Sequence, residues 1–303
     1  MPFEESVMES EGWSSWTEVA DSFSLTPRVL EELLWGGQTF QWFPLDEKRE
    51  VWDGLLNSLR IQLRSNAGNV EFRMLLKTSE LEEARSALKH FFRLDENLEE
   101  LMSFFPLAKD DYLSKCVNAF PGLRILRQPI EKVLLTFLCS SNKHIDQIRK
   151  MLGMIAHRFG EAITDAWHEY PTWQKLAKVT VEELSKCSVG YRGKYIVGSA
   201  QRIAQEPEFF EKLERLPFEE AKMKLIELPG VGEKVADCIL LYGGGHYEAF
   251  PFDTWILKAV SQRYGLEGKS RKEMQRFVEE HLGDNRGIAQ QYIFAYEREV
   301  REL

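Results

Sequence analysis

The chain has 303 residues, enough to bury a substantial core in two or three domains or subdomains. Hydrophobic residues make up 44% and charged residues 29% of the chain, as in an ordinary soluble globular protein. No apolar run approaches the ~20 residues that cross a bilayer, so we expect no membrane partner. Four widely spaced cysteines form no CxxC pair, which predicts reduced thiols and argues against a zinc ribbon or an iron–sulfur cluster.

The charge is unevenly distributed. Taken alone, the formal net charge of −9 argues against a polyanionic partner. However, residues 1–24 carry six acidic side chains and no basic one, whereas residues 186–202 carry four basic side chains and no acidic one. An acidic total can therefore coexist with a basic face, and we expect residues 1–17 to form an acidic N-terminal tail.

The first hundred or so residues favour a sheet. Turn residues separate several short segments rich in aromatic and branched side chains, as in an antiparallel sheet. These predicted strands cover residues 22–25, 39–43, 51–56, 59–64 and 69–75. A helix over residues 27–34, capped by Thr26, is predicted to interrupt the early strands.

Helical periodicity begins near residue 80 and continues to the end of the chain. The predicted helices cover residues 81–94, 98–104, 131–140, 145–159, 181–186, 195–205, 218–227, 233–242, 254–264 and 288–300. The fold class is therefore α+β, with an antiparallel sheet domain (18–123) followed by a larger helical domain (124–303).

A glycine-rich turn joins two of these helices between residues 218 and 242. Pro229 ends the first helix, and Gly230 and Gly232 permit backbone angles that other residues resist. The pattern predicts a helix–hairpin–helix. Backbone amides around Val231 and at the start of the second helix can bind a DNA phosphate without reading sequence. We expect no required cofactor and no metal held by side chains, although the hairpin carbonyls could hold a monovalent or calcium ion.

Lys234 and Asp253 are the candidate reactive pair. Lys234 opens the second hairpin helix, and Asp253 follows nineteen residues later, at the end of a loop (243–254) and the start of the next helix. Each has a simpler interpretation: the lysine could only face a phosphate, and the aspartate could only cap its helix. Together they can cut a base from DNA, since a carboxylate stabilises the positive charge that develops on the sugar and a neutral lysine can attack C1′. Cys238, one turn after Lys234, should line the same cavity.

Further motifs make the pattern specific. The hairpin with Pro251–Asp253 resembles the helix–hairpin–helix (HhH-GPD) DNA glycosylase superfamily. Four more segments resemble its 8-oxoguanine DNA glycosylase branch, in family order and across nearly the whole chain. They are residues 37–42 (GQTFQW), 139–142 (CSSN), 190–195 (GYRGKY) and 289–294 (AQQYIF).

The resemblance implies roles around a flipped base. Lys234 would be the nucleophile and Asp253 the catalytic carboxylate. The Gly37 carbonyl would accept the N7 hydrogen that distinguishes 8-oxoguanine from guanine. Two side chains would hold the base between them and a third would read its Watson–Crick edge; these are Cys238, Phe294 and Gln290.

The resemblance also implies a site for the opposite strand. Asn142, Tyr191 and Arg192 would fill the gap in the duplex and hold the orphaned cytosine. Gln147 stands where eukaryotic members usually have a second cytosine-reading arginine, which predicts a relaxed preference for cytosine. Trp255 replaces a family histidine two residues after the aspartate. Both departures favour a bacterial-type member.

The leading prediction is a bifunctional DNA glycosylase and AP lyase of base excision repair, acting as a monomer on double-stranded DNA that contains oxidised guanine. One alternative is a helix–hairpin–helix glycosylase for alkylated bases, which generally lacks the lysine. Another is a DNA-damage-binding protein without catalysis, in which Asp253 only caps. We expect a cytoplasmic, nucleoid-associated location in a prokaryote, or a nuclear one in a eukaryote.

Overall fold

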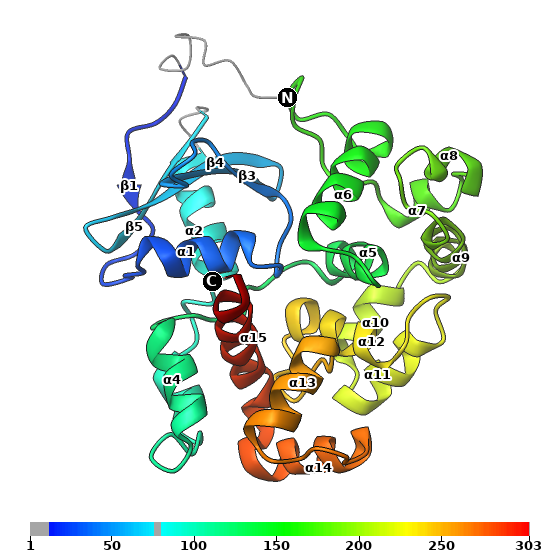
Figure 1. Cartoon of the computed structure of the whole chain (residues 1–303). Coiled ribbons are helices and arrows are strands. Elements are labelled where there is room, and N and C mark those ends of the chain that lie inside the picture. Colours follow the sequence, from blue (N-terminus) through cyan, green and yellow to red (C-terminus); the bar gives the residue numbers. More distant parts are fainter. Residues whose placement is uncertain (1–11, 76–79, 303) are drawn as a thin grey trace.

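The computed structural model describes residues 12–75 and 80–302. A five-stranded sheet with two flanking helices forms one lobe, and the helices from residue 130 onward form a larger one (Figure 1). The last helix returns from the helical lobe to the sheet lobe and ends beside the first helix (Figure 1). The predicted α+β class is confirmed. The predicted boundary between residues 123 and 124 stays a prediction.

The sheet is antiparallel throughout, with the strand order β1-β5-β4-β3-β2. The three strands that come last in the chain, β3, β4 and β5, form two hairpins with two-residue turns. Both residues of each turn have positive φ, the geometry that matches the twist of the strands. The strands are β1 (Thr17–Glu18), β2 (Trp42–Pro44), β3 (Val51–Leu56), β4 (Leu59–Asn66) and β5 (Asn69–Met74).

Two strand predictions were wrong in extent. Residues 22–25 make only one bridge, from Ser24 to Asn69, because β1 and β4 already occupy the two edges of β5. The prediction over residues 39–43 keeps only its last two residues as strand, extended to Pro44. The preceding loop is instead held by the Gln38 side chain, which bonds to the backbone of residues 124 and 126.

The predicted acidic tail ends earlier than expected. Residues 1–11 lie outside the described residues, but Trp13 bridges to Leu75 and β1 pairs with β5. Aromatic rings hold this segment on the sheet, because the Arg73 guanidinium lies 5.2 Å from the Trp13 ring and 4.9 Å from the Trp16 ring. Residues 12–18 are therefore part of the sheet lobe.

Four helices accompany the sheet. They are α1 (Pro27–Trp35), α2 (Leu81–Phe91), α3 (Leu98–Met102) and α4 (Asp111–Ala119). Thr26 caps α1 as predicted, with its hydroxyl accepting the amide of Val29. The sequence reasoning missed α4, although Asp110 provides a clear start signal by accepting the Leu113 amide at 2.8 Å.

The helical lobe contains α5 (Ile130–Ser140), α6 (Ile145–Phe159), α7 (Trp173–Leu176), α8 (Val181–Ser185), α9 (Arg192–Ala204), α10 (Phe209–Arg215), α11 (Phe218–Ile226), α12 (Glu233–Ile239), a π-helix η2 (Leu240–Gly244), α13 (Thr254–Arg263), α14 (Arg271–Leu282), a 3-10 turn η3 (Gly283–Asn285) and α15 (Arg286–Glu302). Two sizeable helices, α10 and α14, were not predicted. The predicted helix over 195–205 begins three residues earlier, at Arg192. The one over 233–242 becomes a π-helix after Ile239.

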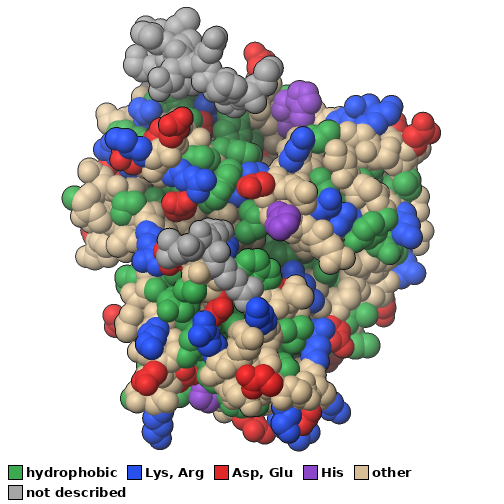
Figure 2. All heavy atoms as spheres, in the orientation of Figure 1, with side chains coloured by type: hydrophobic (Ala, Val, Ile, Leu, Met, Phe, Trp, Pro, Cys, Tyr) green, Lys and Arg blue, Asp and Glu red, His purple; other side chains and the backbone are tan. Residues whose placement is uncertain are grey.

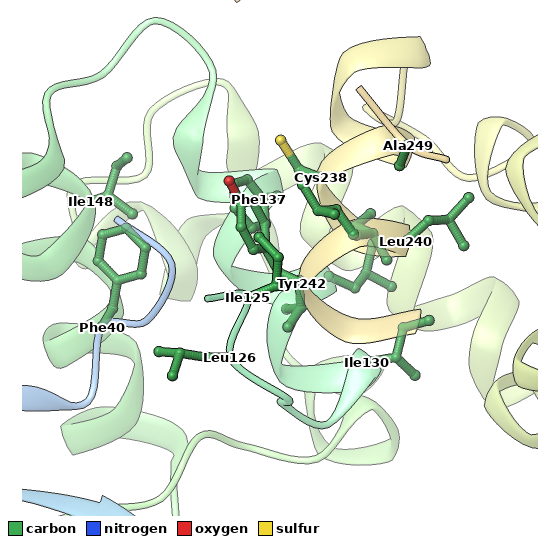
Figure 3. Packing of buried hydrophobic residues seen from close by; sticks show 14 of the residues in the cluster. Phe40, Ile125, Leu126, Ile130, Phe137, Ile148, Cys238, Leu240, Tyr242 and Ala249 are labelled. Carbon is green, nitrogen blue, oxygen red and sulfur yellow. The ribbon is translucent and has the colours of Figure 1, made fainter. Parts of the chain in front are cut away.

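The core is continuous between the lobes. Helix α5 is buried along nearly its whole length and packs against α6, α9, α12 and η2, with Phe137, Cys238 and Tyr242 meeting in one group (Figure 3). At the other side of the molecule, ion pairs join α15 to α1 through Arg298 with Glu32 and through Glu299 with Arg28. These ion pairs join the last helix of the helical lobe to the first helix of the sheet lobe, and one cluster of buried residues includes members of both lobes.

The face drawn in Figure 2 carries basic and acidic side chains interspersed, with hydrophobic side chains in the hollow between the lobes. No large area of one sign is visible on that face. Among the described helices, none is both long and apolar enough to cross a membrane.

Candidate active site

The hairpin between α11 and α12 is a rigid turn held by α9. Gly230 has φ +83°, and a Cβ there would lie 2.6 Å from the Tyr195 ring. The Ser199 hydroxyl donates to the Pro229 carbonyl at 3.0 Å. The Val231 side chain is buried, so the hairpin offers a ligand only the backbone of this residue. Gly232 is the N-cap of α12, where no described side chain caps the first amides. These amides are available for a phosphate.

Lys234 lies in the first turn of α12, half-buried, as predicted. Its Nζ is 5.3 Å from the centre of the Phe137 ring on α5. The amine also lies close enough to the Cys238 thiol, one turn later on the same helix, to act on its pKa. Cys238 and Lys234 are therefore neighbours, and the expectation that they line one cavity stays a prediction.

The Cys238 thiol places the reactive pair in one site. Burial raises the pKa of Cys238 to about 11, Lys234 acts to lower it, and the Asp253 carboxylate acts to raise it. Both charged groups therefore lie close enough to affect the same sulfur. The thiol stays protonated at neutral pH and offers a soft, uncharged surface beside the amine.

Asp253 is the N-cap of α13. Its Oδ1 accepts the amides of Trp255 at 2.9 Å and Ile256 at 2.8 Å. Both capping bonds use the same oxygen, which leaves Oδ2 for a substrate. The simpler interpretation of Asp253 as a cap is therefore correct, and it is compatible with catalysis. The cap thus fixes the position of this carboxylate at the start of α13.

The loop after α1 carries Gly37 at φ +107°, a conformation that side chains rarely adopt. Besides its two bonds to residues 124 and 126, Gln38 accepts the Gln128 side-chain amide on its carbonyl at 2.9 Å. Phe40, at the end of this loop, is buried next to Ile148 of α6 (Figure 3). The Gly37 backbone is thus presented by a fixed loop.

Helix α15 supplies the two remaining predicted base-pocket side chains. Phe294 is half-buried. Gln290 is only 3% exposed, and its Oε1 has no hydrogen-bond partner within the described part of the chain. A buried amide oxygen without a partner is free to accept a hydrogen bond from a ligand.

Three residues of this region were missed by the sequence reasoning. Tyr242 stacks face to face on Phe137, with centroids 5.4 Å apart and planes at 9°. Its hydroxyl donates to Gln291 Oε1 at 2.8 Å. A signal was available for the tyrosine, because it follows Lys234 by two helical turns and Cys238 by one, on the same helix face.

The residues predicted to face the opposite strand lie around the end of α5. Asn142 is exposed with φ +51°, just past the helix. Tyr191 is 50% exposed, as expected for a loop tip. Arg192 is buried instead, because its guanidinium donates to the carbonyls of Ser141 and Val189 and lies 4.5 Å from the Tyr191 ring. In this conformation Arg192 positions the loop rather than projecting from it.

Gln147 is exposed in the first turn of α6, and its Oε1 accepts the His144 amide at 3.4 Å. The departure from arginine thus leaves a neutral side chain that also caps the helix. Within the described residues, no group of three or more His, Cys, Asp or Glu side chains could hold a metal ion. The ion at the hairpin carbonyls stays a prediction.

The comparisons with known proteins divide the chain into two matched regions. Residues 23–134 match the family model "8-oxoguanine DNA glycosylase, N-terminal domain". Residues 135–283 match "HhH-GPD superfamily base excision DNA repair protein". The structure is similar to that of the 8-oxoguanine glycosylase/lyase of Clostridium acetobutylicum in complex with DNA. The two have a TM-score of 0.80 and 30% identity, over 90% of this chain and 92% of that one.

The chain belongs to the 8-oxoguanine DNA glycosylase family. An N-glycosylase/DNA lyase of Arabidopsis thaliana is 33% identical over 229 residues, which are 73% of this chain and 62% of that protein. A probable N-glycosylase/DNA lyase of Methanothermobacter thermautotrophicus is 26% identical over 78% of this chain and 82% of its own length. A 3-methyladenine glycosylase of Archaeoglobus fulgidus shares the fold, with a TM-score of 0.73 at 21% identity.

Proposed function

We propose that this 8-oxoguanine DNA glycosylase family member flips 8-oxoguanine out of duplex DNA, excises it and then cuts the strand at the abasic site. The observation that carries the proposal is the placement of two charged groups around Cys238. The Lys234 amine lies 5.3 Å from the Phe137 ring at the start of α12, Asp253 caps α13 through Oδ1, and both charges act on the Cys238 thiol. An amine and a carboxylate at one buried site are the two groups that the reaction requires.

The chemistry follows from these positions. As the bond between C1′ and N9 of the base breaks, its electrons go to the base and positive charge develops on the sugar, where Asp253 stabilises it. The neutral Lys234 amine forms the new bond to C1′, and the proton that it loses can neutralise the departing base. The nitrogen lone pair then expels the ring oxygen O4′, which takes up a proton, and the bond between C1′ and nitrogen becomes a protonated Schiff base that acidifies C2′. Loss of a proton there breaks the bond between C3′ and its oxygen by β-elimination.

The geometry supports recognition of an oxidised purine. Gly37 presents its backbone from a loop locked by Gln38, so its carbonyl can accept the N7 hydrogen that 8-oxoguanine has and guanine lacks. Cys238 and Phe294 offer surfaces for the two faces of the base, and Gln290 offers an unsatisfied amide oxygen to its edge. Buried polar groups of this kind favour binding of the base that pairs with them, because any other base leaves them without hydrogen bonds.

The DNA contacts form the second part of the proposal. The hairpin amides at Gly230 and Gly232 would hold a phosphate, whereas the Val231 amide already donates to the Leu228 carbonyl at 3.1 Å. Tyr191 and Asn142 are exposed where the opposite strand would pass. The Clostridium complex contains double-stranded DNA with cytosine opposite 8-oxoguanine. A relaxed opposite-base rule, action as a monomer, a cytoplasmic location and bacterial-type membership stay predictions.

Borohydride trapping tests the assignment directly. The wild-type protein is expected to form a covalent adduct with a duplex containing 8-oxoguanine, because borohydride reduces the Schiff base. Lys234→Gln should form none, while Lys224→Gln, which removes a lysine of α11, serves as the matched control. No adduct with the wild type, or an undiminished adduct with Lys234→Gln, would exclude this mechanism. Release of 3-methyladenine without nicking would support the alkylated-base alternative instead.

A further inference from the structure

A buried hydrogen bond lies next to the base pocket and is not explained by the reaction itself. Tyr242 of η2 is 6% exposed and Gln291 of α15 is 1% exposed. The tyrosine hydroxyl donates to Gln291 Oε1 at 2.8 Å, and burial raises the pKa of Tyr242 well above its ordinary value, so the phenol keeps its proton. A phenol that always donates fixes which end of the amide faces it.

The other end of the Gln291 amide is a buried donor. Gln291 Nε2 is buried and has no hydrogen-bond partner among residues 12–75 and 80–302. The preceding residue, Gln290, has the opposite vacancy, an acceptor oxygen without a partner. Two adjacent buried amides therefore offer one unused donor group and one unused acceptor, and buried polar groups left this way call for a ligand.

Tyr242 and Gln291 lie where the edge of the base farthest from Lys234 would be bound. Tyr242 follows Lys234 by eight residues, roughly 12 Å along the helix. Tyr242 lies against Phe137 (Figure 3), and the Lys234 amine lies 5.3 Å from the centre of the same ring. The Asp253 charge acts on Tyr242 as it does on Cys238. Because Lys234 must reach C1′, a purine bound there directs its six-membered ring away from the lysine. The edge that carries the substituent at C6 then faces the Tyr242 end of the pocket.

We propose that Gln291, oriented by Tyr242, donates a hydrogen bond to the 6-oxo group of the flipped purine and so selects 6-oxopurines over 6-aminopurines. The proposal rests on the proposed function. Guanine bases have an acceptor at C6 and adenine bases a donor. Gly37 cannot make this distinction, since 8-oxoguanine and 8-oxoadenine both carry a hydrogen on N7. Tyr242 is thus a positioning residue that acts through Gln291.

The consequence is an asymmetric effect of losing the hydroxyl. In Tyr242→Phe the ring still stacks on Phe137, but the Gln291 amide becomes free to rotate and present its oxygen to an amino group. The ratio of single-turnover release rates for 8-oxoguanine over 8-oxoadenine should fall by about tenfold, the effect of one hydrogen bond. Gln291→Leu should slow 8-oxoguanine release, because the donor is lost outright.

The test uses three duplexes that differ at one position, which holds 8-oxoguanine, 8-oxoadenine or an abasic site, each opposite cytosine. Cutting at the abasic site requires Lys234 but no base, so a merely structural defect lowers it and a defect in base reading does not. Tyr292→Phe is the matched control, since it removes the hydroxyl of a different buried tyrosine, one on α15 that contacts Met102.

The expected result is a reduced ratio in Tyr242→Phe with the abasic cut preserved and Tyr292→Phe like the wild type. An unchanged ratio, or a parallel loss of abasic cutting, overturns the role of Tyr242 while leaving 8-oxoguanine excision intact. If the wild type cuts the abasic duplex but releases neither base, the proposed function fails, and the role of Tyr242 fails with it.

Discussion

The proposed reactive pair and the proposed base pocket of this protein are built in different ways. Lys234 and Asp253 are close in sequence, and each sits at a helix N-terminus whose position is fixed by local backbone geometry. The base pocket instead combines Gly37 from the sheet lobe, Cys238 from α12 and Phe294 from α15. The chemistry thus depends on local structure, whereas selectivity depends on how distant segments pack. Mutations should separate the two.

The largest effect is expected from the reactive pair. Asp253→Asn keeps the cap, since asparagine caps helices as well as aspartate, but loses the charge that stabilises the sugar. Base release should fall on the order of 10²–10³-fold with binding of lesion DNA retained. Single-turnover rates, a binding assay and the melting temperature check this. Wild-type turnover in the variant would remove Asp253 from the mechanism.

A smaller effect, confined to base release, is expected in the pocket. Phe294→Ala removes one face of the sandwich and Gln290→Leu removes the edge acceptor, so 8-oxoguanine release should fall roughly 10- to 100-fold. Cutting at a preformed abasic site should stay near the wild-type rate, because that step needs no base. Phe104→Ala, which truncates a side chain that is 78% exposed, is the control. Equal loss of both activities would contradict the separation of chemistry from selectivity.

A third change tests the opposite strand. Gln147→Arg restores a guanidinium at an exposed position of α6 and should sharpen the preference for cytosine over adenine opposite the lesion by about five- to tenfold. Gln174→Arg adds the same charge on α7 and should not. An excision panel against all four opposite bases measures the effect. The same opposite-base profile in both variants would exclude a reading role for position 147.

The smallest effect concerns stability behind the hairpin. Burial raises the pKa of Asp237 to about 6, with the Lys222 ammonium at 2.7 Å acting to lower it. At a pH above the ordinary pKa of an aspartate but below about 6, Asp237 is therefore protonated in the folded state and ionised in the unfolded state. This group's contribution to the free energy of unfolding should therefore be present at pH 4 and lost as the pH rises through about 6.

Denaturant titrations across this range should show that decline, roughly 1–3 kcal/mol, and Asp237→Asn should flatten it. Asp284→Asn changes a carboxylate whose side chain is 99% exposed, and its profile should match the wild type. A decline of equal size in Asp237→Asn would assign the pH dependence to other groups.

The accuracy of the sequence predictions followed the range of the interactions that decide each element. The hairpin, the Thr26 and Asp253 caps and most long helices were predicted, because periodicity and capping act within a few residues. The strand expected over residues 22–25 was wrong because β1 and β4 pair with β5, which leaves this segment a single bridge. Helix α14 was missed even though Ser270 and Glu273 form a capping box that could have revealed it.

The sequence by itself determined where the proposed reactive pair lies in this protein. A lysine after a glycine hairpin and an aspartate before a helix are placed by local backbone rules, and the ordered motifs identified the family. Only the tertiary structure decided that Arg192 is buried against Ser141 and that Cys238 lies near both Lys234 and Asp253. It also decided that the Tyr242 hydroxyl orients the Gln291 side-chain amide. These facts depend on which groups exclude water together, and that is set by packing between segments far apart in the chain.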